Sequence, residues 1–308
     1  MDRRGFLSQV LPAATLALAA SRVPAAGKSQ PALVITPLAD RLTLISGCGG
    51  NVTLFNSPEG VLLVDGGVQS RSAHLLQAVR KITGTSRVHT LFNSHWHADQ
   101  TGCNGRLGAA GTRIIAHENT RLWLTTDVES RWEQRVYPPL PKIAHPTQTF
   151  YTTGSLQFGG EQIDYGYLPQ AHTDGDLYVY FRNANVLVAA DVVSVGAFPI
   201  IDYCTNGWIG GLATAMQSLL DVSNANTQII PGLGLPQQQS HLTTELAMLN
   251  TMKQRLSRMM AQGMSAAEMI AAAPGREFEA QWGDASLFIA NAYPGMAHRA
   301  GELGMSIV

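Results

Sequence analysis

Short apolar runs separated by glycine- and proline-containing turns follow one another from about residue 32. Runs of this kind, bounded by turn residues, predict β-strands. A different pattern follows, in which Leu75, Leu76 and Val79 fall on one side of a helix. In this half of the chain we expect strands at 42–45, 51–55, 61–64, 88–92 and 113–116, a helix at about 70–83, and helices that begin near residues 98 and 117.

The segment 126–160 interrupts this pattern because it is irregular and rich in proline and aromatic residues. Loops of that length and composition often cover functional sites. Beyond it we expect strands at 163–168, 177–181 and 186–190, and helices at about 208–221, 239–263, 265–273 and 285–300. Because strands and helices recur in two similar halves, the pattern predicts an α/β fold built as a layered sandwich.

The composition indicates a well-buried core and no polyanionic partner. The 308 residues are 45% hydrophobic and 14% charged, with a formal net charge of -1. A chain of this size can form a well-buried core in one large domain or in two small ones. Since the sequence contains no basic run, we do not expect it to bind nucleic acid.

The N-terminal segment, residues 1–26, has the order of regions found in an export signal. An arginine pair at 3–4 precedes an apolar stretch at 10–20, and small residues at 23–26 offer a cleavage site. The apolar stretch is too short to span a bilayer, and the alternative is an N-terminal anchor that is never cleaved. We expect a twin-arginine-like signal and a periplasmic or secreted domain, residues 27–308, that is not held in a membrane after signal removal.

Three cysteines, Cys48, Cys103 and Cys204, make an odd set. In an oxidising compartment they permit at most one disulfide and leave a free thiol. The sequence does not decide which pair would form. We expect small buried or loop cysteines instead of a redox site, because no Cys-x-x-Cys occurs.

The most informative stretch of the chain follows the apolar run 88–92. His95, His97 and Asp99 alternate there, so their side chains can converge only on a tight loop that leaves a strand. Imidazole nitrogens and carboxylate oxygens are ligands that zinc and iron favour. This spacing therefore indicates a metal site.

Two further candidate ligands lie near strand ends. His172 falls between two predicted strands, and Asp191 ends the apolar run 186–190. Loops that leave a packed sheet are places where ligands from distant parts of the sequence meet. We therefore expect His172 and Asp191 to join the histidine motif.

With these residues identified, the chain resembles the metallo-β-lactamase fold superfamily. The matching pieces occur in the family's order and cover essentially all of residues 33–300. They are Val64-Asp65-Gly66-Gly67, His95-x-His97-x-Asp99, the stretch from Ala171 to Asp176, Ala190-Asp191 and Pro231-Gly232-Leu233-Gly234. The resemblance implies a four-layer αββα sandwich with the site at one edge between the two sheets.

The resemblance also implies a role for each ligand residue. His95, His97 and His172 would hold a first metal ion. Asp99 would face a second metal ion, and Asp191 would bridge the two. For Asp99, the N-cap of the helix that follows is a competing role, since aspartate is a preferred capping residue.

Asp65 and two altered positions complete the comparison with the family. Asp65 would brace the histidine loop, and the alternative is an ordinary turn carboxylate. The family usually has histidine where Gln100 and Leu233 stand, and both of those histidines belong to the second metal. Leu233 cannot bind a cation, and an amide carbonyl is a weak ligand for zinc compared with imidazole. The three remaining histidines are enough for one catalytic zinc ion with an open position, so we expect one zinc per chain.

The sequence thus predicts a zinc-dependent hydrolase that acts on a small acyl compound such as a lactone, a β-lactam or a thioester. Asp99 would take a proton from water and pass it to the leaving group, and Asp191 would orient the water. One alternative is a catalytically weak or inactive homologue that still binds metal. Another is a mononuclear iron oxygenase that uses His95 or His97 with His172 and Asp191 as a facial triad. No feature predicts the oligomeric state.

Overall fold

The computed structural model describes residues 32–300, which include all of the predicted site residues. The predicted export signal, residues 1–26, lies outside the described residues. Within the described range, no helix combines the length and the apolar character needed to cross a membrane. Cys48, Cys103 and Cys204 are free thiols, and the first two are buried, as expected of structural cysteines.

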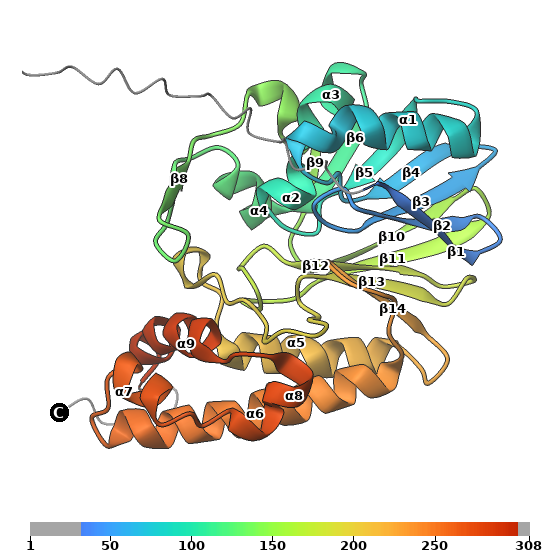
Figure 1. Ribbon diagram of the computed structural model, residues 1–308. Helices are drawn as coiled ribbons and strands as arrows, with labels where there is room; N and C mark the ends of the chain where they lie inside the picture. Colours follow the sequence, from blue (N-terminus) through green and yellow to red (C-terminus); the bar gives the residue numbers. More distant parts are fainter. Residues whose placement is uncertain (1–31, 301–308) are drawn as a thin grey trace, which may run out of the picture. The chain divides into compact units, whose positions relative to one another are not determined.

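Two large β-sheets lie face to face at the centre of the fold (Figure 1). The first sheet has seven strands in the spatial order β1 (Val34–Ala39), β2 (Leu42–Ser46), β3 (Val52–Ser57), β4 (Gly60–Val64), β5 (Val88–Phe92), β6 (Arg113–His117) and β9 (Gln148–Phe150). Strands β1 to β4 pair antiparallel, whereas β4, β5, β6 and β9 pair parallel. The parallel part therefore brings the carboxyl ends of β4, β5 and β6 to one edge.

The second sheet has five strands in the order β10 (Thr153–Phe158), β11 (Glu161–Tyr167), β12 (Leu177–Phe181), β13 (Val186–Ala190) and β14 (Gln228–Pro231). Strands β10 to β13 pair antiparallel, and β14 runs parallel to β13. A separate two-stranded ribbon is formed by β7 (Val128–Ser130) and β8 (Arg135–Tyr137). Because β13 and β14 are parallel, the residues that follow them lie next to each other.

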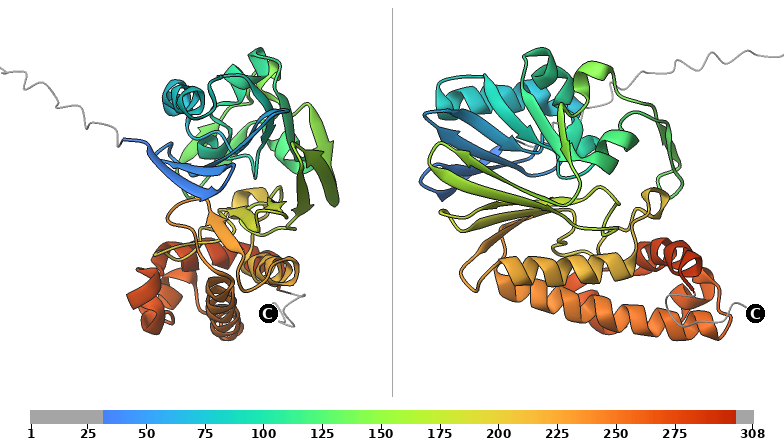
Figure 2. Two further views of the ribbon diagram at one scale, coloured as in Figure 1. Left: turned by 90° about the vertical axis from the view of Figure 1, so that its right-hand side faces the viewer. Right: turned by 180° about the vertical axis from the view of Figure 1, so that it is seen from behind.

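Helices cover the outer faces of both sheets, so the described chain forms four layers in the order αββα (Figures 1 and 2). The α-helices are α1 (Ser72–Thr83), α2 (Ala98–Thr101), α3 (Asn104–Ala109), α4 (Glu118–Trp123), α5 (Ile209–Val222), α6 (Gln239–Ala261), α7 (Ala266–Ala271), α8 (Glu279–Trp282) and α9 (Ser286–His298). Short 3-10 helices are η1 (Gln69–Arg71), η2 (Lys142–Ala144), η3 (Tyr203–Thr205) and η4 (Arg276–Phe278). The predicted four-layer sandwich is confirmed.

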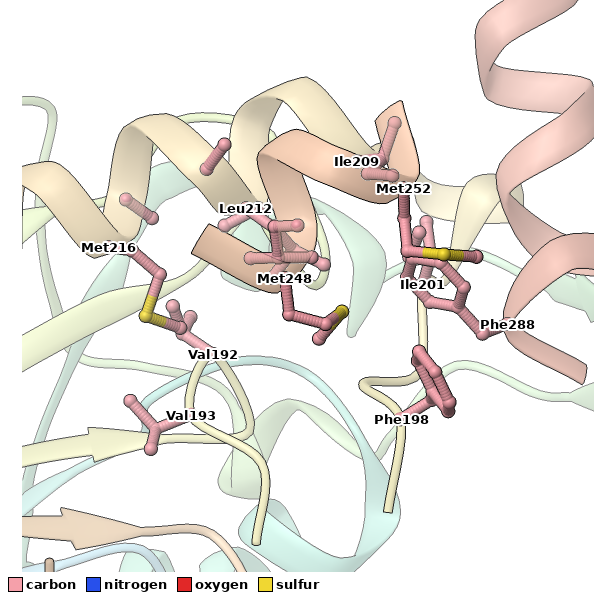
Figure 3. Packing of buried hydrophobic residues seen from close by; sticks show 14 of the residues in the cluster. Val192, Val193, Phe198, Ile201, Ile209, Leu212, Met216, Met248, Met252 and Phe288 are labelled. Carbon is pink, nitrogen blue, oxygen red and sulfur yellow. The ribbon is translucent and has the colours of Figure 1, made fainter. Parts of the chain in front are cut away.

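Apolar side chains fill the spaces between these layers. Phe55 and Phe181, from opposite sheets, meet in the central core with ring centroids 5.7 Å apart. On the outer side of the second sheet, Met216 of α5 packs with Met248 and Met252 of α6 (Figure 3). Burying a side chain of this kind contributes about 1.5–3 kcal/mol. This packing fixes the strands whose ends carry the candidate site.

The sequence pattern misses several short or edge strands. The segment 126–160, expected to be irregular, contains β7, β8, β9, η2 and all of β10. Strands β7, β8 and β9 have three residues each, which is too short for alternation to be recognised. Strand β10 lies at a sheet edge, and only one of its six residues is buried. Strand β14 has four residues and ends at Pro231, so it is too short to show a recognisable alternation of apolar and polar residues.

Candidate metal centre

Strand ends place the candidate ligands at one edge of the two sheets. Strand β5 ends at Phe92, and the loop that follows it carries His95 and His97. His172 lies in the loop between β11 and β12, and Asp191 directly follows β13. The ligand atoms of these four residues all lie within 4.8 Å of one another. The structure thus brings together residues from both sheets, as the sequence predicts.

Three imidazole rings face one another in this cluster. The ring centroids of His95, His97 and His172 are 4.7 to 4.8 Å apart. Nδ1 of His97 lies 3.1 Å from Nε2 of His172, and Nε2 of His95 lies 3.4 Å from Oδ2 of Asp191. All three histidines are buried. The nitrogens at the centre of the cluster are therefore largely shielded from bulk water.

In two of these histidines, a hydrogen bond holds the ring nitrogen that points away from the cluster, called here the outer nitrogen. Nδ1 of His172 donates to the backbone oxygen of Ile200 at 2.8 Å. Nε2 of His97 donates to Oδ2 of Asp202 at 3.0 Å. Carbonyl and carboxylate oxygens only accept hydrogen bonds, so the outer nitrogens carry the protons. In the neutral rings, the inner nitrogens of His97 and His172 are left with lone pairs.

The ring nitrogens that point into the cluster are arranged to coordinate a metal ion and not to hydrogen-bond to one another. Two imidazole lone pairs across 3.1 Å repel each other unless a cation lies beside them. Nε2 of His95 is buried and has no hydrogen-bond partner among the described residues, while its Nδ1 lies 3.1 Å from Oγ of Ser94. Leaving a buried polar atom without a partner is costly. Three imidazole nitrogens and one carboxylate form a donor set that suits zinc.

Burial and the neighbouring carboxylates act in opposite directions on the charges of this cluster. Burial lowers the pKa of His95 and the pKa of His97. At His172 burial has the same effect, but the charges of Asp191 and Asp176 outweigh it and raise the pKa. Burial opposes ionisation of Asp191, yet the neighbouring imidazoles of His95 and His172 lower its pKa. The cluster therefore presents an ionised carboxylate among imidazoles, which attracts a cation.

Asp202 is a site residue that sequence reasoning missed. Its carboxylate is fully buried and, besides His97, accepts hydrogen bonds from Nε1 of Trp132 at 3.3 Å and Oγ1 of Thr205 at 2.6 Å. Burial acts to raise the pKa of Asp202, but the hydrogen bond from His97 and other polar contacts lower it to about 2. An ionised carboxylate behind a metal-binding imidazole orients the ring. The sequence offers only an acidic residue after two isoleucines, which is not a specific signal.

Asp65 braces the histidine loop, as the resemblance implies. Its Oδ1 accepts a hydrogen bond from the backbone N–H of Ser94 at 2.8 Å, and its own N–H donates to the backbone oxygen of Phe92. The residue is buried and has a φ of 66°, a left-handed conformation that is uncommon for residues other than glycine. Burial raises the pKa of Asp65, and this effect outweighs the hydrogen bonds from Ser94, which act to lower the pKa. Asp65 thus ties the end of β4 to the loop that carries His95.

A glycine after β14 leaves room for the side chain of Asp191. A Cβ atom at Gly232 would lie 1.6 Å from Oδ1 of Asp191. Asn51 holds this segment, because its side chain donates to the backbone oxygen of Pro231 at 2.9 Å and its N–H donates to that of Gly232 at 2.7 Å. The segment 231–234 therefore belongs to the site although it supplies no metal ligand.

The residues around Asp99 do not fit a second metal ion. Asp99 lies in the first turn of α2, and His97 holds the N-cap position, so the suggested capping role of Asp99 is wrong. Nε2 of Gln100 lies 3.3 Å from Oδ2 of Asp191 and 3.5 Å from Oδ2 of Asp99. An amide between two carboxylates presents its N–H groups to them, because both carboxylates can only accept. At the other altered position, the side chain of Leu233 is 70% exposed.

A cavity of about 200 Å³ opens beside the cluster. It is lined by Gly49, Asp99, His172, Asp191, Val193, Ser194, Val195, Ala197, Phe198, Ile200 and Leu233. A molecule in this cavity would contact one of the three histidines and both carboxylates. A larger cavity of about 710 Å³, between α3 and the segment 135–144, is lined by none of the four candidate ligands. The smaller cavity is therefore the candidate substrate site.

Comparisons with known proteins agree with this geometry. The family model for the metallo-beta-lactamase superfamily matches residues 45–236. A metallo-beta-lactamase type 2 from Bacillus sp. (strain 170) is 21% identical over 185 residues, which are 60% of this chain and 66% of the relative. The match thus spans slightly less than two thirds of that relative's length.

Solved structures show the same architecture at low sequence identity. A metallo-beta-lactamase from Pontibacter korlensis has a TM-score of 0.58 and 18% identity, and the match covers 71% of this chain and 99% of that one. The DIM-1 metallo-beta-lactamase has a TM-score of 0.57 and 17% identity, covering 72% and 98% of the two chains. Likeness at this level of identity is evidence for the fold alone.

Proposed function

As this chain belongs to the metallo-beta-lactamase superfamily, we propose that it is a metallo-hydrolase that holds one zinc ion with His95, His97 and His172. Its substrate is a small acyl compound such as a lactone, a β-lactam or a thioester. One observation carries the proposal: the inner nitrogens of the three histidines converge on one point beside Asp191, while hydrogen bonds hold the outer nitrogens.

The chemistry of the proposed reaction is divided between the metal and the chain. His95, His97 and His172 would hold the zinc ion, which would supply a Lewis acid for a carbonyl oxygen and would make a water beside it easier to deprotonate. Asp191 faces the cavity and is placed to accept a hydrogen bond from the attacking water and to orient it. Asp99 faces the same cavity, takes the proton of that water and passes it to the leaving group. One water is consumed as one acyl bond breaks.

Gln100 has a separate role in this proposal. Its amide nitrogen reaches both Asp99 and Asp191, so it holds the two carboxylates apart and in place without adding positive charge. Because both N–H groups of this amide are then directed at the carboxylates, a departing anion would meet no cation at the position where the family usually has a second metal ion. We therefore expect low activity on substrates with poor leaving groups.

A metal-binding homologue without appreciable activity is the second candidate function. Gln100 and the exposed Leu233 favour it, since both replace residues that the family uses for a second metal ion. An iron oxygenase would use the same buried ligands, and elemental analysis separates it by reporting iron. Because residues 1–26 have the pattern of an export signal, we also propose that the protein acts on a small molecule in the periplasm or outside the cell.

Hydrolysis of a panel of lactones, β-lactams and thioesters tests the proposal. We expect zinc-dependent turnover by the wild type, and its loss in the His97→Ala variant. The matched control is His74→Ala, which removes an exposed histidine of α1 and should leave the rate unchanged. Zinc binding without turnover of any panel compound would favour the inactive homologue. Equal turnover by wild type and His97→Ala would exclude catalysis at the proposed centre.

A further inference from the structure

The larger cavity, of about 710 Å³, carries two arginines and no acidic residue. Its lining comes from residues 68–70, from α2, α3 and the turn between them, and from the segment 135–144. Arg106 lies on α3 and Arg135 on β8. Among the described residues that form the lining there is no aspartate or glutamate. Because two guanidinium groups line one space without a carboxylate, this space, called here the arginine cavity, favours an anionic ligand.

The protein itself does not neutralise either guanidinium group. The arginine ion pairs found among the described residues involve neither Arg106 nor Arg135. The guanidinium carbon of Arg135 lies 4.4 Å from the ring centroid of Tyr137, a cation–π contact that orients the side chain and leaves its N–H groups able to donate. Glu133, in the turn between β7 and β8, accepts a hydrogen bond from the hydroxyl of Tyr137 at 3.0 Å and does not line the cavity. Both arginines therefore keep donors for a carboxylate.

Hydrogen bonds hold the wall that the segment 135–144 forms. The backbone N–H of Leu140 donates to the backbone oxygen of Leu124 at 2.9 Å, and the carbonyl of Leu140 accepts from Nε2 of His145 at 2.7 Å. Near the end of the segment, the side chain of Asn104 in α3 donates to the backbone oxygen of Ala144 at 3.0 Å. Because both Leu140 and Ala144 line the arginine cavity, this wall is in place before a ligand arrives.

An apolar recess of about 40 Å³ adjoins the arginine cavity. Ala98, Thr101 and Leu140 line both spaces, so the two are continuous. The aromatic rings of the recess are packed, since those of Trp96 and Tyr137 meet edge to face with centroids 5.2 Å apart. A ligand that occupies both spaces would thus have one anionic end and one aromatic or other apolar end. The recess is otherwise lined by Trp96, Trp123, Leu124, Tyr137 and Pro138.

The arginine cavity and the proposed metal centre lie on different faces of α2. Ala98 and Thr101, three residues apart on the helix, line the cavity. Asp99 and Gln100 between them are directed at Asp191 and the histidine cluster. The positive charge of a zinc ion held there would add to that of the two arginines, so the metal centre does not oppose an anion in this cavity.

We infer that the arginine cavity is a binding site, separate from the metal centre, for a small organic anion with an aromatic end. The carboxylate of such a ligand pairs with Arg106 and Arg135, and its ring lies toward the recess beside Trp96 and Tyr137. The inference goes beyond the proposed hydrolase function and does not depend on it, because none of the four candidate metal ligands lines this cavity.

Naphthoate and its neutral amide, naphthamide, test this inference because they share one ring system and differ in charge. We expect calorimetric titration of the zinc-loaded wild type to show naphthoate binding at least about fivefold more tightly than naphthamide. The Arg106→Gln, Arg135→Gln double variant should bring the two affinities within about twofold of each other. The matched control Arg80→Gln, Arg87→Gln removes the same charge from exposed positions outside the cavity and should leave the preference unchanged.

A variant that fills the cavity tests the location without changing any charge. Gly105 lines the cavity, and a Cβ atom there would meet no other atom within 4 Å. We expect Gly105→Leu to weaken naphthoate binding about tenfold or more while leaving the zinc content unchanged. Ala110→Leu, at an exposed position next to α3 and outside the cavity, is the control.

Titration of zinc-free protein separates this site from the metal centre. Wild type stripped of zinc by a chelator, with its fold checked by circular dichroism, should bind naphthoate within about threefold of the loaded protein. Naphthoate binding that requires zinc, or that survives both the arginine double variant and Gly105→Leu, would place the anion elsewhere and overturn the inference. Equal affinity of the wild type for naphthoate and naphthamide, or no binding of either, would also overturn it. Naphthoate binding at this site without any hydrolase activity would refute only the proposed function.

Discussion

Nε2 of His97 lies 3.0 Å from Oδ2 of Asp202, a buried carboxylate that follows it by 105 residues in the sequence. The same Oδ2 accepts a hydrogen bond from Oγ1 of Thr205 at 2.6 Å, so the carboxylate cannot turn away from the ring. The ring of His97 is therefore held with Nδ1 toward His172. The geometry of the metal cluster depends on residues behind it as much as on the ligands themselves.

Removing this carboxylate should weaken metal binding while leaving all four candidate ligands present. We expect Asp202→Ala to lower zinc affinity about 10- to 100-fold, because His97 loses the acceptor that fixes its tautomer and orientation. Asp202→Asn keeps a carbonyl acceptor and should recover part of that affinity. Competition with a chromophoric chelator measures both variants. Wild-type zinc affinity in Asp202→Ala would show that Asp202 has no positioning role.

Restoring the two altered positions should create a second metal site. In the Gln100→His, Leu233→His double variant we expect the zinc content to rise toward two ions per chain, since Asp99 and Asp191 already flank the position. The matched control combines Gln100→His with Leu235→His, which places the second histidine outside the cavity. Elemental analysis of the purified proteins measures the outcome. An unchanged zinc content in the first variant would contradict our assignment of these positions.

Gly232 should tolerate no side chain. A Cβ atom there would lie 1.6 Å from Oδ1 of Asp191, so Gly232→Ala must displace that carboxylate or the backbone. We expect a loss of stability of about 1–3 kcal/mol, typical of overpacking, together with weaker zinc binding. Gly105→Ala in α3 is the control, because its Cβ would meet no atom within 4 Å. Urea unfolding and zinc titration of both variants provide the comparison, and equal behaviour would refute the steric argument.

Glu245 should make the stability of the protein depend on pH. Burial raises the pKa of Glu245 well above its ordinary value of 4.5, with Ser194 and His241 as its polar neighbours. Above pH 4.5 the unfolded chain ionises this group while the folded chain keeps it neutral, so the free energy of unfolding falls as pH rises. The fall reaches at most about 1.4 kcal/mol per pH unit and ends above the folded-state pKa.

The Glu245→Gln variant tests this dependence because glutamine does not titrate. Relative to the wild type, we expect its free energy of unfolding to increase as pH rises from 5 to 8, as measured by urea unfolding. A pH-independent difference between the two proteins would mean that Glu245 is ionised in the folded state.

The sequence allowed the four clustered candidate ligands to be predicted because their spacing and order are local signals. His95 and His97 stand in one short motif, and His172 and Asp191 follow strands that have clear apolar patterns. Asp202 could not be found in this way, since its contact with His97 arises only when the chain has folded around both sheets. The role of Gln100 as a donor to two carboxylates also depends on tertiary placement.

The missed strands have a similar explanation. Strand β14 is too short to show alternation. It is stabilised by pairing with β13 and by hydrogen bonds from the side chain of Asn51 to the backbone oxygens of Pro231, its last residue, and of Gly234. Strand β10 lies at a sheet edge and buries only one of its six residues, so its pairing with β11 defines it better than its composition does. Pairing between distant segments decides both cases, and a local pattern does not contain that information.

The zinc content of the wild-type protein, purified without added metal and measured by elemental analysis, tests the central claim most directly. The account predicts about one zinc ion per chain, lost in a His95→Ala, His97→Ala, His172→Ala triple variant that remains folded. Two tightly bound zinc ions per wild-type chain would contradict it, because Gln100 and Leu233 would then not have removed the second site.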